Sequence, residues 1–396
     1  MLAALLLCFS TLLATLSFFP ARPVAALVSD AYPGEQRDLE LARRYAPVFY
    51  QRLAGGDFDR RFDYITNFDF DGDWVGNNNW EHAVDKRFPM RAYVYYAVVE
   101  TETHYFITYA AFHARDWSAV QPLLGSVLDQ IQKSEKYGKY LPPELRQVVE
   151  LNHENDLEGA QFIIRKAGRA GPEQVEAVET VAHDEFHAYL SEATTLAPPR
   201  HHDGVLHLEQ GRPALYAEAQ KHGIHAYPYH GHGAGSIFDV PDGPLLVSRY
   251  KGVAEDPERM PAQAEGKEPG DVGYDLLPLY SAFWKKARGL EKPNLTFGEV
   301  FDFGDSYCRQ VPRGVLGRIA GSLCKLGNTG VALRGDFAGK NKAMLPWGWS
   351  SPQEPQLARG DWFLSPVQLM KAHYPDAESS QTYLSNPFLG VFRDQR

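Results

Sequence analysis

Two runs of strand-favouring residues, separated by only four polar residues, constrain the fold most strongly. The first is RAYVYYAVV at 91–99, and the second is HYFITYAAF at 104–112. Valine, isoleucine, threonine and aromatic residues fit a pleated, half-buried surface, and the polar stretch 100–103 is short enough for a hairpin loop. Aromatic residues make up 13% of the chain, which favours the same class. The sequence therefore predicts an antiparallel hairpin within a mainly β fold.

Further segments extend this pattern on both sides of the hairpin. We expect a short helix at 38–47, which passes into the extended piece PVFYQ. We also expect strands at 158–166 and 212–219, where β-branched and aromatic residues recur. Residues 175–190 leave two alternatives open, because their apolar positions fit a helix as well as a bulged strand.

Two stretches differ from the β pattern. Residues 117–150 carry apolar residues at helical spacing and predict a helical insertion. Residues 251–294 are rich in proline, glycine and charge, which is typical of surface loops. We therefore expect a core at 38–250 and an irregular, loop-rich C-terminal extension at 251–396 that packs on it. The tryptophans of this extension either pack in that wrap or stack on sugars or at a membrane interface.

The N-terminal segment has the character of a secretory signal. Residues 2–19 carry no charge, and the small residues Val24-Ala25-Ala26 suit cleavage before Leu27. Residues 1–26 thus predict a signal peptide and a secreted or periplasmic protein, although the apolar run is also long enough for a marginal membrane anchor. In an oxidising compartment, Cys308 and Cys324 favour one disulfide, with two buried thiols as the alternative.

Charge and motif content exclude several classes of function. The formal charge is 40 − 50 = −10, and no cluster of Lys and Arg is present, which disfavours nucleic acid as a partner. The chain has no Gly-x-Ser-x-Gly elbow, no P-loop, no His-Glu-x-x-His and no dinucleotide fingerprint in its strand–helix context. The sequence therefore leaves open whether the protein is an enzyme.

The most informative local pattern is the segment NHENDLEG at 152–159. In an extended segment, Asp156 and Glu158 point to the same face, and His153 can fold back over them from a preceding turn. Two carboxylates and an imidazole brought together repel one another or lose solvation unless a cation lies among them. The pattern predicts a divalent-metal site, with a polar turn whose carboxylates face water as the alternative.

A second acidic pattern lies upstream, at residues 67–73. Asp69, Asp71 and Asp73 are spaced like the head of a calcium-binding loop, but Asn78 replaces the expected glutamate at the twelfth position. The segment predicts either a simple calcium-binding turn or a turn whose carboxylates accept backbone N–H bonds. The polar loop continues through Asn79 and Trp80, which could line a ligand site.

Several of these segments resemble known families. Residues 152–158 resemble the heptapeptide Gly-His-Arg-His-Asp-Trp-Glu of the secreted necrosis- and ethylene-inducing proteins, with Leu157 in place of the tryptophan and Asn155 in place of the second histidine. The segment YAAFHARD, which ends at Asp116, resembles the strand that ends in an aspartate ligand in that family, and His183 resembles a histidine beside its metal. The segments ARRYAP at 42–47 and RPALY at 212–216, the latter leading to His222, resemble the vacuolar-protein-sorting "sixty-two" type family.

The resemblance covers roughly 40–250 and carries expectations about fold and function. It implies a two-sheet antiparallel β-sandwich with a divalent cation at one end, and the helical insertion at 117–150 is a departure from it. The necrosis-inducing proteins bind sphingolipids of plant membranes and lyse cells. The vacuolar-sorting type has no secure biochemical activity.

From residues and resemblance together, the expected metal ligands are Asp116, His153, Asp156 and Glu158. Three carboxylates favour Ca²⁺, Mg²⁺ or Mn²⁺ over Zn²⁺. The other site residues that the sequence suggests are His183 and His187 as acid–base groups, and His222, Asn79 and Trp80 as ligand-binding groups.

Three functions remain open at this point. The first is metal-dependent recognition of a glycan or lipid headgroup, with a membrane surface as one target. The second is a metal-dependent hydrolase of phosphoesters or glycans, in which His183 acts as the base on a metal-bound water. The third is a secreted scaffold with a structural calcium ion. An open coordination position would distinguish the second from the third.

Overall fold

The predicted hairpin forms the middle of the fold. Strand β2 (Tyr93–Thr101) pairs antiparallel with β3 (His104–Asp116), and the two join through a tighter turn than the sequence indicated. The structure is a computed structural model. It describes residues 31–56, 59–74, 78–117, 153–168, 171–182, 185–199, 201–229, 242–259, 270–284, 346, 349 and 360–393.

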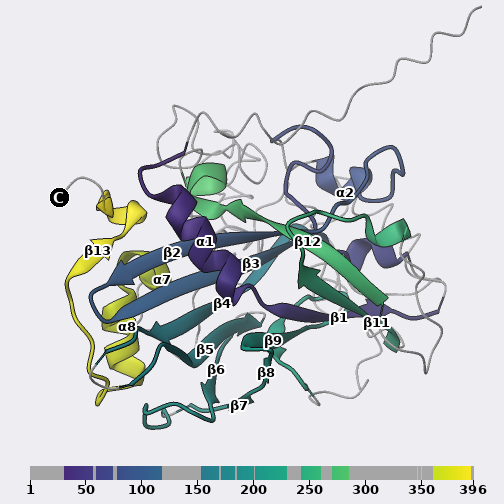
Figure 1. Ribbon diagram of the computed structural model, residues 1–396. Coiled ribbons are helices and arrows are strands. Elements are labelled where there is room, and N and C mark those ends of the chain that lie inside the picture. The colour runs from purple at the N-terminus through teal and green to yellow at the C-terminus, as the bar shows by residue number, and fades with distance from the viewer. Residues whose placement is uncertain are drawn as a thin grey trace, which may run out of the picture. The chain divides into compact units, whose positions relative to one another are not determined.

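The described chain is mainly β, as predicted (Figure 1). The other strands are β1 (Val48–Ala54), β4 (His153–Arg165), β5 (Gln174–Ala182), β6 (Glu185–Ser191), β7 (Gly204–Leu206), β8 (Leu208–Glu209), β9 (Arg212–Ala217), β10 (Ile224–Ala226), β11 (Asp242–Tyr250), β12 (Gly270–Pro278) and β13 (Tyr383–Ser385). The helical elements are α1 (Glu35–Tyr45), η2 (Arg60–Asp63), α2 (Asn79–His82), η5 (Pro257–Arg259), η6 (Tyr280–Trp284), α7 (Asp361–Leu364), α8 (Pro366–His373) and η10 (Pro387–Leu389).

The strands join in one continuous sheet instead of the two antiparallel sheets of the expected sandwich. The order is β10-β9-β1-β11-β12-β2-β3-β4-β5-β6-β7, with β13 beside β2 and β8 beside β9. Strand β12 runs parallel to both β11 and β2 and so connects two groups of strands. The sheet is nearly closed on itself, because the Tyr189 hydroxyl of β6 lies 3.4 Å from the Nδ1 atom of His225 on β10.

Most of the local predictions within the described residues are confirmed. The helix expected at 38–47 is α1, and it ends before Pro47 because the residue preceding a proline is pushed out of the helical region. The strands expected at 158–166 and 212–219 are β4 and β9. The open alternative at 175–190 resolves as two strands, β5 and β6, joined as an antiparallel pair.

The prediction of loop is wrong for residues 270–278. They form β12, an inner strand with buried Val272 and Tyr274. Two glycines, Gly270 and Gly273, and the proline at its end, Pro278, masked the strand pattern, since these residues are typical of loops. Other expectations lie outside the described residues, namely the signal peptide at 1–26, the Cys308–Cys324 disulfide and, except for Trp117, the helical insertion at 117–150.

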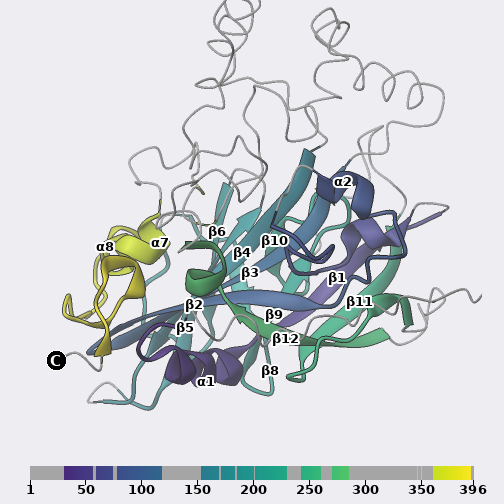
Figure 2. The ribbon, with the colours of Figure 1, turned by 90° about the horizontal axis from the view of Figure 1, so that it is seen from above.

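Helix α1 covers one face of the sheet (Figures 1 and 2). The hydroxyl of Tyr109 on β3 donates a 2.7 Å hydrogen bond to the carbonyl of Ala42, and the hydroxyl of Tyr274 on β12 donates one of 2.6 Å to the carbonyl of Pro47. Leu41, Ala42 and Tyr45 are buried. The helix therefore anchors to the sheet through buried tyrosine hydroxyls as well as apolar packing.

The C-terminal helices α7 and α8 lie against β4 and β5. The side chain of Gln161 donates a 2.7 Å hydrogen bond to the carbonyl of Trp362, and the Nδ1 atom of His373 lies 2.6 Å from a carboxylate oxygen of Glu179. The indole rings of Trp349 and Trp362 are both buried, with centroids 5.4 Å apart in a T-shaped arrangement. Of the two alternatives for these tryptophans, packing in the C-terminal wrap is confirmed.

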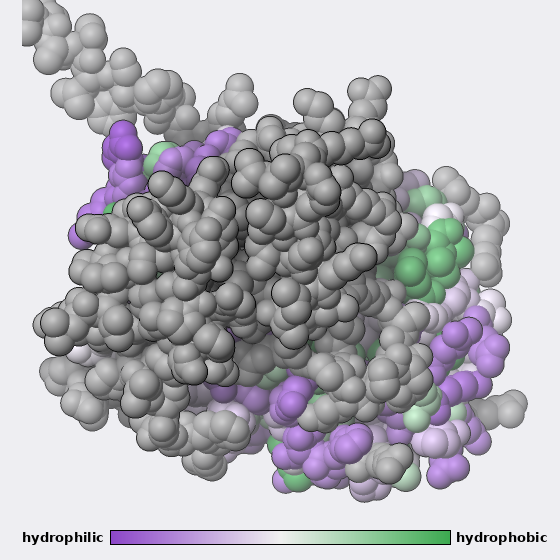
Figure 3. All heavy atoms as spheres, turned by 180° about the vertical axis from the view of Figure 1, so that it is seen from behind, coloured by the Kyte–Doolittle hydropathy of each residue, from purple (hydrophilic) through white to green (hydrophobic). Residues whose placement is uncertain are grey.

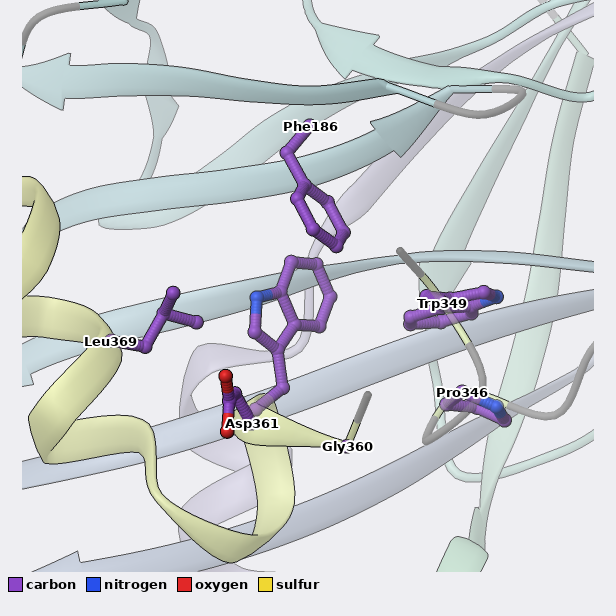
Figure 4. A pocket seen from close by; sticks show the side chains of 7 residues that line it. Phe186, Pro346, Trp349, Gly360, Asp361 and Leu369 are labelled. Atoms are coloured by element: carbon purple, nitrogen blue, oxygen red, sulfur yellow. The ribbon is translucent and has the colours of Figure 1, made fainter. Parts of the chain in front are cut away.

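A small apolar hollow lies beside these tryptophans (Figure 4). It is lined by Phe186, Pro346, Trp349, Gly360, Asp361, Trp362 and Leu369. The ring of Phe186 lies 5.6 Å from that of Trp362, so aromatic side chains fill most of this region. The hollow is a feature of the packing between β6 and α7.

Substitution of Gly159 tests this packing directly. A Cβ atom at Gly159 would lie 2.5 Å from the carbonyl oxygen of Tyr109 and 2.6 Å from the ring of Trp349. Gly159→Ala is therefore expected to lower the free energy of unfolding by about 1–3 kcal/mol, as overpacking does. Gly168→Ala is the matched control, because a Cβ atom there meets nothing within 4 Å. Chemical denaturation measures both, and equal stability of the two variants would contradict this packing.

Polar and apolar residues gather separately on the visible described surface. On the face seen from behind, hydrophilic residues gather at the lower right, and hydrophobic residues form one group at the right (Figure 3). The exposed large hydrophobic residues of the described chain are Val84, Val205, Val253 and Leu389. Within the described residues, no helix combines the length and apolar character needed to cross a bilayer.

Candidate functional site

A buried polar cluster forms where β3 and β4 pair. Their register places His113 of β3 opposite Asp156 of β4. Directly opposed residues of an antiparallel pair share a face, so the imidazole and the carboxylate project to the same side of the sheet. His113 is 0% exposed and Asp156 is 4% exposed. The sheet thus carries two ligand-type side chains into its interior.

The segment between β9 and β10 brings His222 to the same place. The backbone N–H of Trp117 donates a 3.1 Å hydrogen bond to the carbonyl of Gln220, which ties the end of β3 to this turn. Gln220 and His222 both have positive φ angles, 68° and 56°, and so reverse the chain sharply. The His222 ring then stacks on His113, with centroids 3.8 Å apart and planes 6° apart, and its Nδ1 atom lies 2.9 Å from the Oδ2 atom of Asp156.

Asp63 of η2 fixes the other side of His222. Its Oδ1 atom lies 3.4 Å from the Nε2 atom of His222. The same carboxylate accepts hydrogen bonds from the backbone N–H of Ala54 (2.7 Å), the backbone N–H of Gln220 (2.9 Å) and the indole N–H of Trp117 (3.2 Å). Asp63 therefore joins four segments of the chain around the cluster.

The two stacked imidazoles differ in protonation state. Burial, together with the nearby charge on His222, holds the pKa of His113 well below its usual range, so this ring is neutral. Burial also lowers the pKa of His222, but hydrogen bonds and charge from Asp156 and Asp63 outweigh it and raise the pKa to about 9. His222 is therefore protonated at neutral pH when no cation is present, between two carboxylates.

The cluster offers ligands for a cation. Within the described residues, one group of three metal-ligating side chains is brought together, His113, Asp156 and His222, with one ligand atom of each within 4.8 Å of the others. The Nδ1 atom of His113 is buried without a hydrogen bond, and the Nε2 atom of His222 has only the long, 3.4 Å contact with Asp63. Ligands at about 2.1 Å from a tetrahedral ion lie about 3.4 Å apart, so an ion would draw these side chains closer.

The four expected ligands do not all lie in this cluster. Asp156 belongs to it, and Glu158 is buried two residues along the same face of β4. Asp116 forms an ion pair with Lys221 and is paired in register with His153. Because successive residues of a strand face opposite sides, Asp116 and Asp156 belong to opposite faces of the β3–β4 pair. The side chain of His153 lies outside the described part of the chain, so the four-ligand set remains a prediction.

The other predicted site residues are spread over several elements. The Nδ1 atom of His187 on β6 lies 3.2 Å from the Oδ1 atom of Asp203. Asn79 of α2 is buried and donates a 2.6 Å hydrogen bond to the side chain of Asn155, next to Asp156. His183 and the side chain of Trp80 lie outside the described residues. Of the suggested ligand-binding residues, His222 lies inside the cluster.

The acidic segment 67–73 forms a turn. The Oδ2 atom of Asp71 lies 2.6 Å from the Nδ1 atom of His82, and its Oδ1 atom accepts a 3.2 Å hydrogen bond from the backbone N–H of Asp73. The Oδ1 atom of Asp69 accepts a 2.9 Å hydrogen bond from the Asn67 amide. These contacts fit a turn held by its own carboxylates, and calcium binding at this turn remains a prediction.

Sequence reasoning did not single out His113 and Asp63. The sequence could have indicated His113, because this residue lies in the predicted strand that leads to Asp116. Aligning that strand with 153–165 would have placed it opposite Asp156. For Asp63 no local signal exists, because its three hydrogen bonds come from residues 9, 54 and 157 positions away.

No family model matches the sequence, and no curated protein matches it, so the likeness to the vacuolar-sorting type has no support. Two solved structures are similar. One, described as "Toxin fold for microbial attack and plant defense", is 13% identical, covers 49% of this chain and 69% of its own, and has a TM-score of 0.26.

The other structure is the non-toxic HaNLP3 protein, which is 11% identical, covers 69% of this chain and 84% of its own, and has a TM-score of 0.27. HaNLP3 is one of the NLPs, the necrosis- and ethylene-inducing proteins that residues 152–158 distantly resemble. At these TM-scores, neither similarity supports an inference about function.

Proposed function

We propose that this chain is an exported recognition protein whose fold is stabilised by one divalent cation, bound by His113, Asp156 and His222. The cation holds β3, β4 and the turn before β10 together. The recognition target is a glycan or a lipid headgroup, as the sequence analysis predicted, and the character of residues 1–26 supports export.

The observation that carries this proposal is a buried ring nitrogen without a hydrogen bond, the Nδ1 atom of His113, beside a second imidazole and a buried carboxylate. A buried polar atom without a partner costs roughly 1–3 kcal/mol, and a cation bound among the three side chains would satisfy it. A protonated His222 between Asp63 and Asp156 offsets one of their two negative charges without a cation, but it leaves the His113 nitrogen unsatisfied.

The donor set indicates which cation would bind. Two imidazole nitrogens and one carboxylate suit Zn²⁺, Mn²⁺ or Fe²⁺ better than Ca²⁺ or Mg²⁺, which take oxygen ligands. Of the first three cations, Mn²⁺ is the one that was also expected for the carboxylate-rich ligand set predicted from the sequence. Binding must also displace the proton from His222, so affinity is expected to increase with pH.

Burial favours a structural ion over a catalytic one. His113 and His222 are 0% exposed, and Asp156 is 4% exposed. A catalytic metal keeps an open position that a substrate can reach, whereas a structural metal is enclosed by its ligands. The hydrolase alternative therefore has less support than the structural role.

Metal analysis of untagged protein tests the proposal. We expect about one equivalent of a transition cation per chain, and its loss in His113→Gln, which keeps a polar side chain but removes the imidazole. His207→Gln is the matched control, because His207 is exposed and outside the cluster. Circular dichroism establishes that each variant is folded. Wild-type protein that stays metal-free after dialysis against Zn²⁺ and Mn²⁺ would refute the proposal.

A further inference from the structure

Three neighbouring strands carry aromatic side chains that lie side by side, in a row that runs across the strands. The register pairs Tyr50 of β1 with Tyr216 of β9, and Tyr216 with His225 of β10. Phe49 and Gln51, on either side of Tyr50, are buried, whereas Tyr50 is half-exposed. Because strand residues alternate between faces, Tyr50, Tyr216 and His225 share one face of the sheet, where the two tyrosines are partly exposed and His225 is buried.

Two further tyrosines extend this row after β10 ends. The ring of Tyr227 stacks on Tyr50, with centroids 3.6 Å apart and planes 6° apart. The ring of Tyr229 stacks on His225 at 3.8 Å and 6° and lies 5.3 Å from Tyr216. All four tyrosines are half-exposed. We refer to Tyr50, Tyr216, Tyr227 and Tyr229 as the tyrosine row.

Sheet stabilisation explains only part of the tyrosine row. Cross-strand aromatic neighbours stabilise a sheet, and this accounts for Tyr50 beside Tyr216. Tyr227 and Tyr229 lie outside any strand and add rings on the outer side, where polar residues would keep the surface better solvated. A contiguous group of partly exposed aromatic rings of this kind is typical of a binding surface.

Paired polar groups surround the rings. The hydroxyl of Tyr50 hydrogen-bonds to the carboxylate of Glu209, which also accepts a 2.7 Å hydrogen bond from Arg249. The Oε1 atom of Glu218 lies 3.2 Å from the Nε2 atom of His225. Each carboxylate thus has a basic partner, and the rim offers donors and acceptors without a strong excess of either charge.

We infer that the tyrosine row binds an uncharged oligosaccharide of pyranose sugars. A pyranose ring has an apolar C–H face that packs on an aromatic ring, and a rim of hydroxyl groups that the paired polar residues can bind. This inference rests on the recognition role in the proposed function and names its ligand class. It does not depend on the cation, because none of its residues belongs to the His113 cluster.

Calorimetric titration with cellohexaose, chitohexaose and mannohexaose tests this inference. We expect at least one of them to bind with a dissociation constant on the order of 1 mM or tighter. Tyr227→Ala should weaken that binding about tenfold, because it removes an outer ring, whereas Tyr227→Phe keeps the ring and most of the affinity. Binding should persist in EDTA, so failure of metal binding and failure of sugar binding are separate results.

Tyr105→Ala is the matched control, since Tyr105 is a half-exposed strand tyrosine outside the row. Its sugar affinity should equal that of the wild type, and thermal melts establish that all variants are folded. The inference is overturned if none of the three sugars binds at about 10 mM, a concentration well above the expected dissociation constant. Equal loss in Tyr227→Ala and Tyr105→Ala would also overturn it, as would Tyr227-dependent binding to phosphatidylcholine vesicles in place of sugars.

Discussion

Replacing Asp63 by alanine is expected to lower the free energy of unfolding by about 3–5 kcal/mol. Asp63 is 0% exposed, and its carboxylate accepts hydrogen bonds from Ala54, Gln220 and Trp117. Alanine leaves all three donors buried without a partner, and each unsatisfied donor costs roughly 1–3 kcal/mol before relaxation. It also removes one of the two carboxylates beside His222.

Urea denaturation of Asp63→Ala and of a control, Asp85→Ala, measures this effect. Asp85 forms a surface ion pair with the exposed Arg87, and surface pairs contribute roughly 0–1 kcal/mol. We expect the control to unfold at nearly the wild-type midpoint. If the two variants lose similar stability, Asp63 does not hold these segments together as the structure indicates.

The elements predicted well are those whose signal is local. The hairpin of β2 and β3 follows from strand-favouring residues on both sides of a short polar turn, and the end of α1 follows from Pro47. In both cases, neighbouring residues decide the backbone conformation. Such patterns are visible in a single sequence because they need no information on distant contacts.

The single sheet could not be predicted in this way. It depends on β12, which pairs with β11 at residue 246 and with β2 at residue 93. A strand buried between two parallel neighbours takes its stability from those contacts, so glycine at 270 and 273 is tolerated despite its loop character. The prediction of a two-sheet sandwich was made with the residues of this joining strand assigned to a surface loop.

The candidate site shows the same division between local and distant information. Asp156 was predicted because its acidic neighbours are adjacent in sequence. His113 follows only from the strand register, and His222 only from a turn with positive φ angles that closes on β3. Sequence reasoning therefore singled out two residues of the cluster, Asp156 and His222, but assigned them to different sites.

The second large effect is expected at Asp38, which should make stability fall as pH increases. Asp38 lies on α1, is 1% exposed, and accepts a 2.7 Å hydrogen bond from the hydroxyl of Tyr32. Burial raises the pKa of Asp38 to about 7, against opposing effects from the Tyr32 hydrogen bond and Arg37. The folded protein therefore holds a proton that the unfolded chain releases near pH 4.

The direction of this pH effect follows from the difference between the folded and unfolded pKa of Asp38. A raised folded-state pKa stabilises the folded protein below the unfolded value, and this contribution is lost as pH increases from about 4 to about 7. At about 1.36 kcal/mol per pKa unit, and allowing for local relaxation, the loss is about 2–4 kcal/mol. Asp38→Asn cannot ionise and still accepts the Tyr32 hydrogen bond, so it should exceed the wild type in stability by this amount at pH 8 and match it at pH 4.

Urea denaturation at pH 4, 6 and 8 measures the difference between Asp38→Asn and the wild type, which cancels the titration of all other groups. Asp376→Asn is the control, because Asp376 is exposed and lies outside α1. Its difference from the wild type should stay within about 0.5 kcal/mol at every pH. A difference for Asp38→Asn that is constant with pH would mean that the Asp38 carboxylate ionises normally despite its burial on the inner side of α1.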